Sequence, residues 1–212
     1  MRRIGITQRV ETDARRAERR DCLDHRWIHL LQSLDLHGVA IPNNLDQPRC
    51  WLEMMDWDGF ILTGGNDIAT LPHAAEPAPE RDRTERELLD FALCRQLPVL
   101  GVCRGLQILN VQLGGSVSAL PGHVACRHGV VPCSGASRFA SFREVNSFHR
   151  MAIMPGDLAE ELHATAHAPD RSVEAAAHRS LPWYGIMWHP ERESPSVAAD
   201  LALLRHCFGL TE

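Results

Sequence analysis

The stretch Pro98 to Gly115, PVLGVCRGLQILNVQLGG, decides the fold. Its first five residues form an apolar run that is typical of a buried strand, and its second half carries leucines at helical spacing. Between these two patterns, Cys103 stands with Gly101 and Gly105 on either side. The stretch therefore predicts a strand, a sharp turn and a helix, with a thiol at the turn.

Cys103 is a candidate nucleophile. In a G-x-C-x-G turn the reactive side chain is presented on a strained elbow, and the glycines let the neighbouring backbone pass where a Cβ would clash. The unpaired N–H groups at the start of the following helix favour a thiolate over a thiol. A lone cysteine at a strand end more often serves packing, but the paired glycines and the amphipathic helix favour a nucleophile. Such a nucleophile needs a base elsewhere in the chain.

Strand and helix patterns alternate on the N-terminal side of this stretch. Strands are predicted at residues 3–6, 39–41 and 59–62, and helices at 12–36, 50–55 and 83–95. Within the first helix, the charged segment 14–27 is interpreted as a solvated face, and the proline-rich segment 72–82 is predicted to be a surface loop. The alternation indicates a parallel sheet whose strands are joined by crossover helices.

On the C-terminal side, strands are predicted at residues 143–147, 171–177 and 183–188, followed by a final helix at 197–207. In an open parallel sheet, ligands bind beyond the carboxyl ends of the strands. Both Cys103 and the pair Gly64-Gly65 follow such strand ends. We therefore expect these two loops, distant in sequence, to meet in one crevice.

His189 and Glu191 are the candidate partners of the thiol. They lie two positions apart after a predicted strand, and on an extended backbone such residues face the same side and can form a hydrogen bond. A thiolate needs a proton acceptor that later protonates the leaving group, and a carboxylate fixes the tautomer of that imidazole. His-Pro-Glu alone fits a surface turn equally well, but together with the elbow it predicts a Cys103, His189, Glu191 triad.

Backbone N–H groups are the candidate donors to a developing oxyanion. The residue after the nucleophile, Arg104, supplies one natural donor, and Gly65 is the obvious second. Gly64 and Gly65 carry no side chain, so the backbone of this turn can approach a substrate closely. An ordinary tight turn is the alternative interpretation of the glycine pair.

Composition bounds the class of protein. With 212 residues, 44% of them apolar, the chain can bury one good core, and we expect a single domain over residues 1–212. The net charge is −5, and basic residues are concentrated only at Arg15 to Arg20, so a nucleic-acid partner is not expected. No secretory signal or membrane-spanning apolar run is visible, which predicts a cytoplasmic protein without a membrane partner.

Cysteine and histidine spacing gives no metal motif. Seven widely spaced cysteines without a C-x-x-C pair predict neither a disulfide framework nor a structural zinc site. The twelve histidines include no H-E-x-x-H motif, and His123 and His128 lack the short spacing of metal motifs and have no neighbouring carboxylate in the sequence. We therefore predict no metal and no cofactor.

Six blocks together resemble a known family. They are T-G-G-N-D at 63–67, R-D-R-T-E at 81–85, the cysteine block at 98–110, V-N-S-F-H at 145–149, V-E-A at 173–175 and G-I-M-W-H-P-E at 185–191. In this order they resemble the class I glutamine amidotransferase-like hydrolases of the peptidase C26 family, and within it the γ-glutamyl-γ-aminobutyrate hydrolase branch. The resemblance covers nearly the whole chain.

The resemblance implies both a fold and a reaction. The implied fold is a flavodoxin-like, open parallel sheet with flanking helices. The implied reaction runs through a γ-glutamyl thioester on Cys103, with a small-molecule γ-glutamyl conjugate as the substrate. By the same likeness, the residues lining the pocket for the glutamyl end are Gln107, Asn146, Ser147 and His149.

Some features depart from that branch and bear on the leaving group. Met187 stands where the family usually has Gln, the chain is short, and it carries Gly5 to Arg9 at the start and Arg192-Glu193 after the triad. In these respects it is similar to small bacterial enzymes that hydrolyse γ-glutamyl-CDP-amidate in capsule phosphoramidate synthesis. This likeness makes Arg9 a candidate for binding a phosphate-bearing leaving group, since a guanidinium pairs bidentately with phosphate. An arginine in an exposed loop is the alternative.

Other functions remain open from the sequence. One alternative is hydrolysis of γ-glutamyl-γ-aminobutyrate in polyamine breakdown, and another is a glutaminase subunit that passes ammonia to a separate synthetase. A third is a non-catalytic binding protein on the same fold, in which the thiol would be inert. A homodimer is compatible with the sequence.

Overall fold

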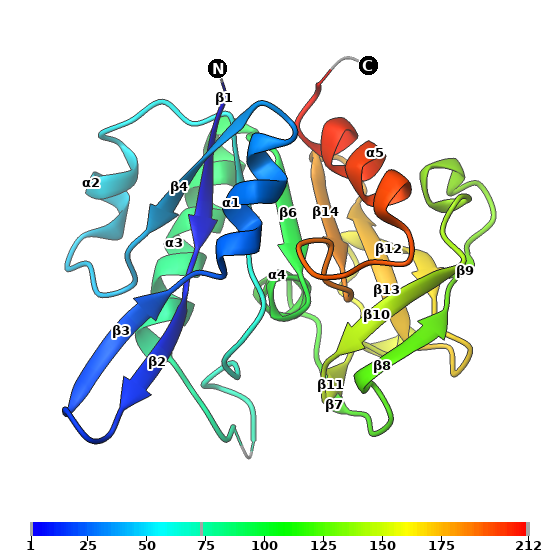
Figure 1. Ribbon diagram of the computed structural model, residues 1–212, viewed down its shortest axis with the longest axis horizontal. Coiled ribbons are helices and arrows are strands. Elements are labelled where there is room, and N and C mark those ends of the chain that lie inside the picture. Colours follow the sequence, from blue (N-terminus) through cyan, green and yellow to red (C-terminus); the bar gives the residue numbers. More distant parts are fainter. Residues whose placement is uncertain (1, 73, 211–212) are drawn as a thin grey trace.

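The computed structural model describes residues 2–72 and 74–210 and is built around one eight-stranded mixed sheet (Figure 1). Five neighbouring strands run parallel, in the order β4 (Leu36–Ile41), β1 (Arg2–Thr7), β5 (Gly59–Leu62), β6 (Val99–Val102) and β14 (Trp183–Ile186). Three antiparallel strands extend the sheet beyond β14, namely β13 (Val173–His178), β12 (Leu162–His167) and β9 (Val131–Pro132).

Helices cover both faces of the parallel half. The strands turn alternate side chains to opposite faces, so Ile61 and Leu100 pack with residues of α1 (His25–Gln32) and α5 (Val197–Cys207). On the other face, Phe60 and Val99 pack with residues of α2 (Pro48–Leu52), α3 (Pro79–Arg95) and α4 (Arg104–Gln112). The predicted flavodoxin-like sheet with flanking helices is therefore confirmed.

Three small sheets and two short helical turns decorate this core. The segment β8 (Val124–Gly129) pairs antiparallel with β10 (Glu144–Phe148), and β7 (Ser118–Ala119) pairs with β11 (Met151–Ala152). The third pair is a hairpin of β2 (Arg9–Asp13) and β3 (Glu18–Cys22). The 3-10 turns are Ser137–Phe139 and Pro155–Asp157.

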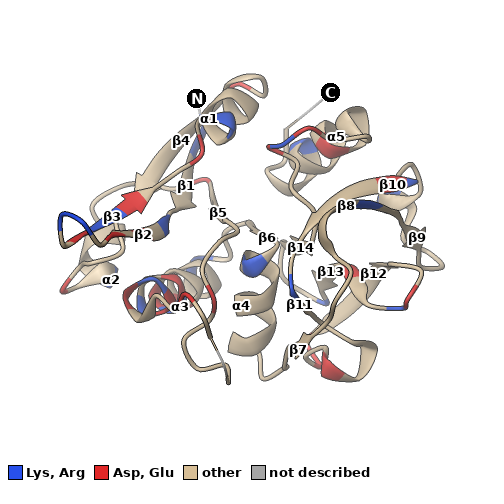
Figure 2. Cartoon of the chain, turned by 60° about the horizontal axis from the view of Figure 1, so that its bottom comes forward, with Lys and Arg blue, Asp and Glu red and all other residues tan. Residues whose placement is uncertain are grey.

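The helix predicted at residues 12–36 is wrong in its first half. Residues 9–22 form the β2–β3 hairpin, and only His25–Gln32 is helical. The apolar residues that suggested a helix all follow Cys22, whereas the charged segment before them carries no apolar stripe and turns at Ala17, which has a φ of 52°. Segment 14–27 is accordingly not one helix face, although it does carry charges of both signs (Figure 2).

Most other predicted elements are confirmed within a few residues, including the strand, turn and helix around Cys103 and the C-terminal helix. The loop predicted at 72–82 is too long, because α3 begins at Pro79, where proline fits the first helical turn; its residue 73 lies outside the described residues. Strand β12 was not predicted. Among the residues that the structure describes, no helix combines the length and the hydropathy needed to cross a membrane.

Candidate active site

Cys103 lies at the elbow between β6 and α4. Its backbone has φ 55° and ψ −109°, and its N–H donates to the Ile186 carbonyl at 2.7 Å. A Cβ on Gly101 would lie 2.6 Å from the carbonyl carbon of Gly105, so only glycine lets these two backbone segments approach so closely. The local geometry is the strained elbow that the G-x-C-x-G pattern predicts.

His189 is held in place beside the elbow from two sides. Its Nδ1 lies 2.7 Å from Glu191 Oε1, which is the hydrogen bond expected from the sequence. Its backbone N–H donates to Asn146 Oδ1 at 2.8 Å, and its carbonyl accepts from Asn146 Nδ2 at 2.9 Å. Both His189 and Glu191 are buried. The imidazole is therefore fixed in one tautomer, with Nδ1–H directed at the carboxylate.

The thiol and the imidazole stabilise each other's charged forms. Burial alone would raise the pKa of the Cys103 thiol, but the charge of His189 and a hydrogen bond from it bring that pKa below its ordinary value. Burial alone would lower the pKa of His189, but Cys103 and Glu191 raise it to about 9. Each group therefore favours the charged form of the other, the thiolate of Cys103 and the imidazolium of His189.

The turn at Gly64 and Gly65 reaches the same place, as expected from the strand ends. A Cβ on Gly64 would lie 2.7 Å from His189 Cε1 and 3.5 Å from Cys103 Cβ. Gly65, Cys103 and Arg104 line one cavity of about 350 Å³. The two loops do meet in one crevice, and the thiol faces a cavity bordered by backbone.

Arg81 positions this glycine turn, a role that the sequence analysis missed. Its guanidinium donates to the carbonyls of Thr63, Gly64 and Gly65 at 2.6, 3.0 and 2.8 Å, and it is fully buried. Its ion-pair partner is Glu85, 2.9 Å away and one helical turn along α3. The i, i+4 spacing of Arg81 and Glu85 was the available signal.

Arg104 completes a buried ion cluster behind the elbow. Its guanidinium pairs with Asp82 and Glu85, and its side chain is only 2% exposed. Burial alone would raise the pKa of Glu85, but Arg104 and Arg81 hold it below the ordinary value. The side chain of Arg104 is therefore structural, and only its backbone N–H is available for the predicted role at the oxyanion.

The four residues expected around a glutamyl group separate into three positions. Gln107 and His149 line the cavity that contains Cys103. Asn146 instead lies behind His189, where it also donates to the Glu193 carbonyl. Ser147 is fully buried, and its hydroxyl donates to the His123 carbonyl at 2.8 Å, so its side chain is engaged away from the Cys103 cavity.

Arg9 lies against the glycine turn and lines a small cavity together with His189 and Arg192. A Cβ added to Gly65 would lie 3.2 Å from both Cβ and Cδ of Arg9. The guanidinium of Arg9 forms an ion pair with Glu11. Arg9 also lines an open cavity of about 720 Å³ together with Gly65 and Asn66. Arg9 is thus close to the elbow, with half of its side chain exposed.

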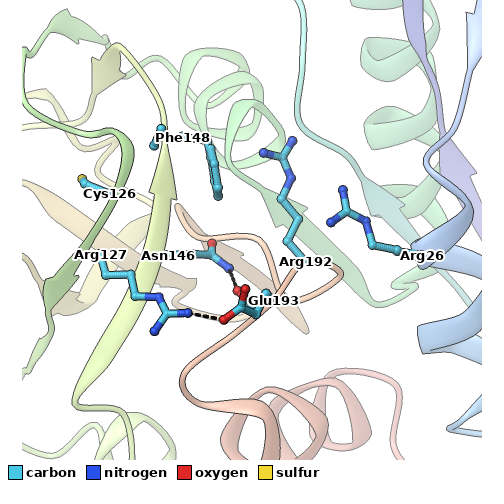
Figure 3. Close-up of a pocket in the computed structure, with 8 residues that line it drawn as sticks. Arg26, Cys126, Arg127, Asn146, Phe148, Arg192 and Glu193 are labelled. Carbon is cyan, nitrogen blue, oxygen red and sulfur yellow. Dashed lines mark hydrogen bonds and ion pairs between the residues drawn. The ribbon is translucent and has the colours of Figure 1, made fainter.

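A second arginine-lined cavity, of about 490 Å³, was not predicted (Figure 3). The guanidinium groups come from separate elements: Arg26 from α1, Arg127 from β8, and Arg192 from the segment after His189. Phe148 separates this cavity from that of Cys103 and lines both. Its ring lies 5.7 Å from that of His189 and 4.3 Å from the Arg192 guanidinium carbon.

Solved structures share this fold. A glutamine amidotransferase from Thermotoga maritima superposes with a TM-score of 0.67 at 18% identity, over 99% of this chain and 94% of that one. A candidate GMP synthase subunit from Thermoplasma acidophilum gives a TM-score of 0.72 at 20% identity, with the same coverage. The protein therefore has the glutamine amidotransferase fold.

The family follows from the sequence comparisons. The sequence model of the peptidase C26 family matches residues 3–191, and the chain belongs to that family. A curated relative, the γ-glutamyl-CDP-amidate hydrolase of Campylobacter jejuni, is 31% identical over 209 aligned residues. The alignment covers 98% of this chain and 98% of that protein.

Proposed function

We propose that the protein is a cysteine-dependent hydrolase of γ-glutamyl amide or phosphoramide bonds. The observation that carries this proposal is the buried alignment of Cys103, His189 and Glu191 at the wall of a cavity, with the thiol pKa lowered by the imidazole. Membership in the peptidase C26 family supports a hydrolase.

The reaction would proceed in two halves. The Cys103 thiolate attacks the γ-carbonyl carbon, and the resulting oxyanion is stabilised by the backbone N–H groups of Gly65 and Arg104. The His189 imidazolium then donates its proton to the departing nitrogen, leaving a γ-glutamyl thioester. Next, neutral His189 takes a proton from water, which attacks the thioester, releases glutamate and restores the thiolate–imidazolium pair. Glu191 keeps the imidazole oriented throughout.

The two cavities on either side of Phe148 suit the two ends of such a substrate. The cavity with Cys103, Gln107 and His149 would take the glutamyl end. The neighbouring cavity is lined by three guanidinium groups, of which that of Arg26 pairs with Asp24 and that of Arg127 with Glu193. Phe148, which lines this cavity, contacts the ring of His189, the group that would protonate the leaving nitrogen. Guanidinium groups pair bidentately with phosphate oxygens. This arrangement favours a leaving group that carries phosphates.

Our best candidate for the substrate is γ-glutamyl-CDP-amidate, the compound named for the Campylobacter jejuni relative. Its diphosphate would reach more than one of Arg26, Arg127 and Arg192, whereas the single carboxylate of a γ-aminobutyrate leaving group would engage at most one or two. The protein would then act in capsule phosphoramidate synthesis. Arg9, which lines a larger cavity at the glycine turn, is the alternative phosphate contact.

The test is glutamate release from γ-glutamyl-CDP-amidate, γ-glutamyl-γ-aminobutyrate and glutamine. We expect the nucleotide conjugate to be preferred and Cys103→Ala to abolish turnover of all three. Residual activity near that of the parent in Cys103→Ala would overturn the catalytic assignment. A preference for the aminobutyrate conjugate would keep the chemistry but overturn the assigned substrate.

Arginine variants locate the leaving group. Arg127→Gln and Arg192→Gln should raise KM for the nucleotide conjugate by about 10- to 100-fold each, the loss of one charge-assisted hydrogen bond of about 1.5–3 kcal/mol. Both should raise KM for the aminobutyrate conjugate by less than KM for the nucleotide conjugate, because its single carboxylate would engage fewer of the three arginines. Arg20→Gln, on the exposed β3 strand, is the matched control. If Arg9→Gln alone raises KM, the diphosphate binds in the cavity lined by Arg9, Gly65 and Asn66 instead.

A further inference from the structure

Four metal-ligating side chains meet between the β8–β10 sheet and the main sheet. His128 lies on β8 and His123 directly before it, His149 directly follows β10, and Glu174 lies on β13. Their ligating atoms all lie within 4.8 Å of one another. The sequence analysis saw no carboxylate near His123 and His128, but pairing of the strands brings Glu174 to both.

The distances centre on one carboxylate oxygen. Glu174 Oε1 lies 3.6 Å from His128 Nε2, 3.6 Å from His149 Nε2 and 3.9 Å from His123 Nδ1. In a tetrahedral zinc site with bonds of about 2.0–2.1 Å, neighbouring ligand atoms lie about 3.4 Å apart. The distances from Oε1 to the three nitrogens are therefore close to ligand spacing. The ligating atoms as a set lie within 4.8 Å of one another, so the rings would move closer together around an ion.

The opposite nitrogen of each ring is already engaged, which fixes the tautomers. His149 Nδ1 and His128 Nδ1 each lie 3.0 Å from a backbone carbonyl, of Met151 and Gly129 respectively, and therefore carry their protons. His123 Nε2 lies 2.8 Å from Asp170 Oδ2 and donates to that carboxylate. The nitrogens directed at Glu174 are thus left with free lone pairs. Such outer hydrogen bonds are typical of histidines that bind metal.

The inner atoms of the cluster lack hydrogen-bond partners. His123 Nδ1, His128 Nε2, His149 Nε2 and both oxygens of Glu174 are buried and have no hydrogen-bond partner among the described residues. A divalent cation at the centre of the cluster would neutralise this fully buried carboxylate and accept the three lone pairs. Three imidazoles and one carboxylate are the ligand set that zinc and similar divalent transition metals prefer.

We propose that His123, His128, His149 and Glu174 form a closed, four-ligand site for one divalent transition metal ion, with zinc as the reference ion. Four protein ligands leave no open coordination position, which is typical of a structural site. The ion would fasten the β8–β10 sheet to β13 of the main sheet. Since β10 leads into Phe148 and His149, metal binding would also order the wall that separates the two cavities.

Zinc binding to the Cys103→Ala protein tests this site without interference from the thiolate and without an activity measurement. After chelator treatment and removal of the chelator, we expect one equivalent of Zn²⁺ per chain in calorimetry, with a Kd on the order of 10⁻⁷ M or tighter. Zinc at about 100 times Kd should raise Tm by roughly 5–10 °C. Cobalt should give visible bands without thiolate charge-transfer absorption.

Variants identify the ligands. In the same background, Glu174→Gln and His128→Ala should weaken zinc binding at least 100-fold, whereas His163→Ala, on the exposed side of β12, should not change it. Asp170→Asn keeps all four ligands and should weaken binding by about 10- to 100-fold through the orientation of His123. Circular dichroism of each metal-free variant establishes that it is folded. The proposal would be overturned by unchanged zinc affinity in Glu174→Gln or by a cobalt spectrum with thiolate charge-transfer bands. It would also be overturned if the parent bound no zinc, which would indicate that protons neutralise the cluster.

Discussion

At the residue scale, the proposed chemistry depends on the charge state of Cys103. His189 is close enough to lower the thiol pKa, although burial acts in the opposite direction. Burial instead raises the pKa of Cys22, Cys133 and Cys207, and it does so at Cys133 although His167 Nδ1 lies 3.3 Å from that sulfur. The surroundings of Cys103 therefore stabilise its thiolate form.

We expect Cys103 to react with iodoacetamide at pH values well below the ordinary thiol pKa of 9.0, because the thiolate is the reactive form. His189→Ala should move the midpoint of the rate–pH profile upward, since the positive charge that stabilises the thiolate is lost. The measurement is the alkylation rate of the Cys103 peptide by mass spectrometry between pH 5 and pH 10.

The exposed Cys50 provides an internal comparison in the same samples, and its profile should not respond to His189→Ala. Equal midpoints for Cys103 and Cys50 would contradict the ion pair. An inert Cys103 at every pH would favour the non-catalytic alternative.

At the scale of elements, the cluster between α3 and α4 fixes the glycine turn. Glu85→Gln should lower the free energy of unfolding by about 3–5 kcal/mol, because it leaves Arg81 and Arg104 buried without their shared charge. Glutamate release should fall as well, since Arg81 holds the carbonyls at 63–65. Urea unfolding measures the first effect, and Asp90→Asn, on the exposed side of α3, is the control. A change below about 1 kcal/mol would contradict this role.

Elements with their own apolar pattern could be predicted from the sequence, and the others could not. The helix α5 and the β6 to α4 elbow follow local periodicity and glycine spacing. The β2–β3 hairpin has almost no buried side chain, with Val10 as the exception, so no alternation of polar and apolar residues marked it. Its strands are held by pairing with each other, which depends on the turn at Ala17.

At the level of the whole molecule, the candidate sites also differ in how far the sequence predicts them. His189 and Glu191 are neighbours in sequence, and the elbow indicated where their partner should be. By contrast, Arg26, Arg127 and Arg192 are far apart in the chain, as are His128 and Glu174. Only the order of the strands in the sheet and the packing of β8 and β10 bring these groups together. No local sequence pattern predicts that order or that packing.

The free energy of unfolding of the whole molecule should depend on pH through the ionisation of Asp200. Burial raises the pKa of this carboxyl to about 6, while Trp188 Nε1, 2.8 Å away, and Ser194 donate to it. An acid with a raised native pKa retains its proton where the unfolded chain has released it, so its contribution is complete below about pH 4. That contribution is lost as the pH rises through 6.

Asp200→Asn should therefore gain stability relative to the parent as the pH increases from 4 to 7.5, by up to about 3 kcal/mol. Asparagine keeps an acceptor for Trp188 and no longer ionises. Urea unfolding of both proteins at several pH values measures the difference, and Asp90→Asn should show no such trend. Parallel profiles for the parent and Asp200→Asn would contradict the raised pKa.

The backbone of Cys103 has a consequence for how this chain can evolve. Its φ of 55° with ψ of −109° is unfavourable for every residue except glycine, so the thiol is kept at the expense of stability. A descendant released from selection for the reaction would become more stable by replacing Cys103 with glycine. At this position, a substitution that abolishes the proposed reaction would thus increase the stability of the fold, and retention of the cysteine requires continuing selection.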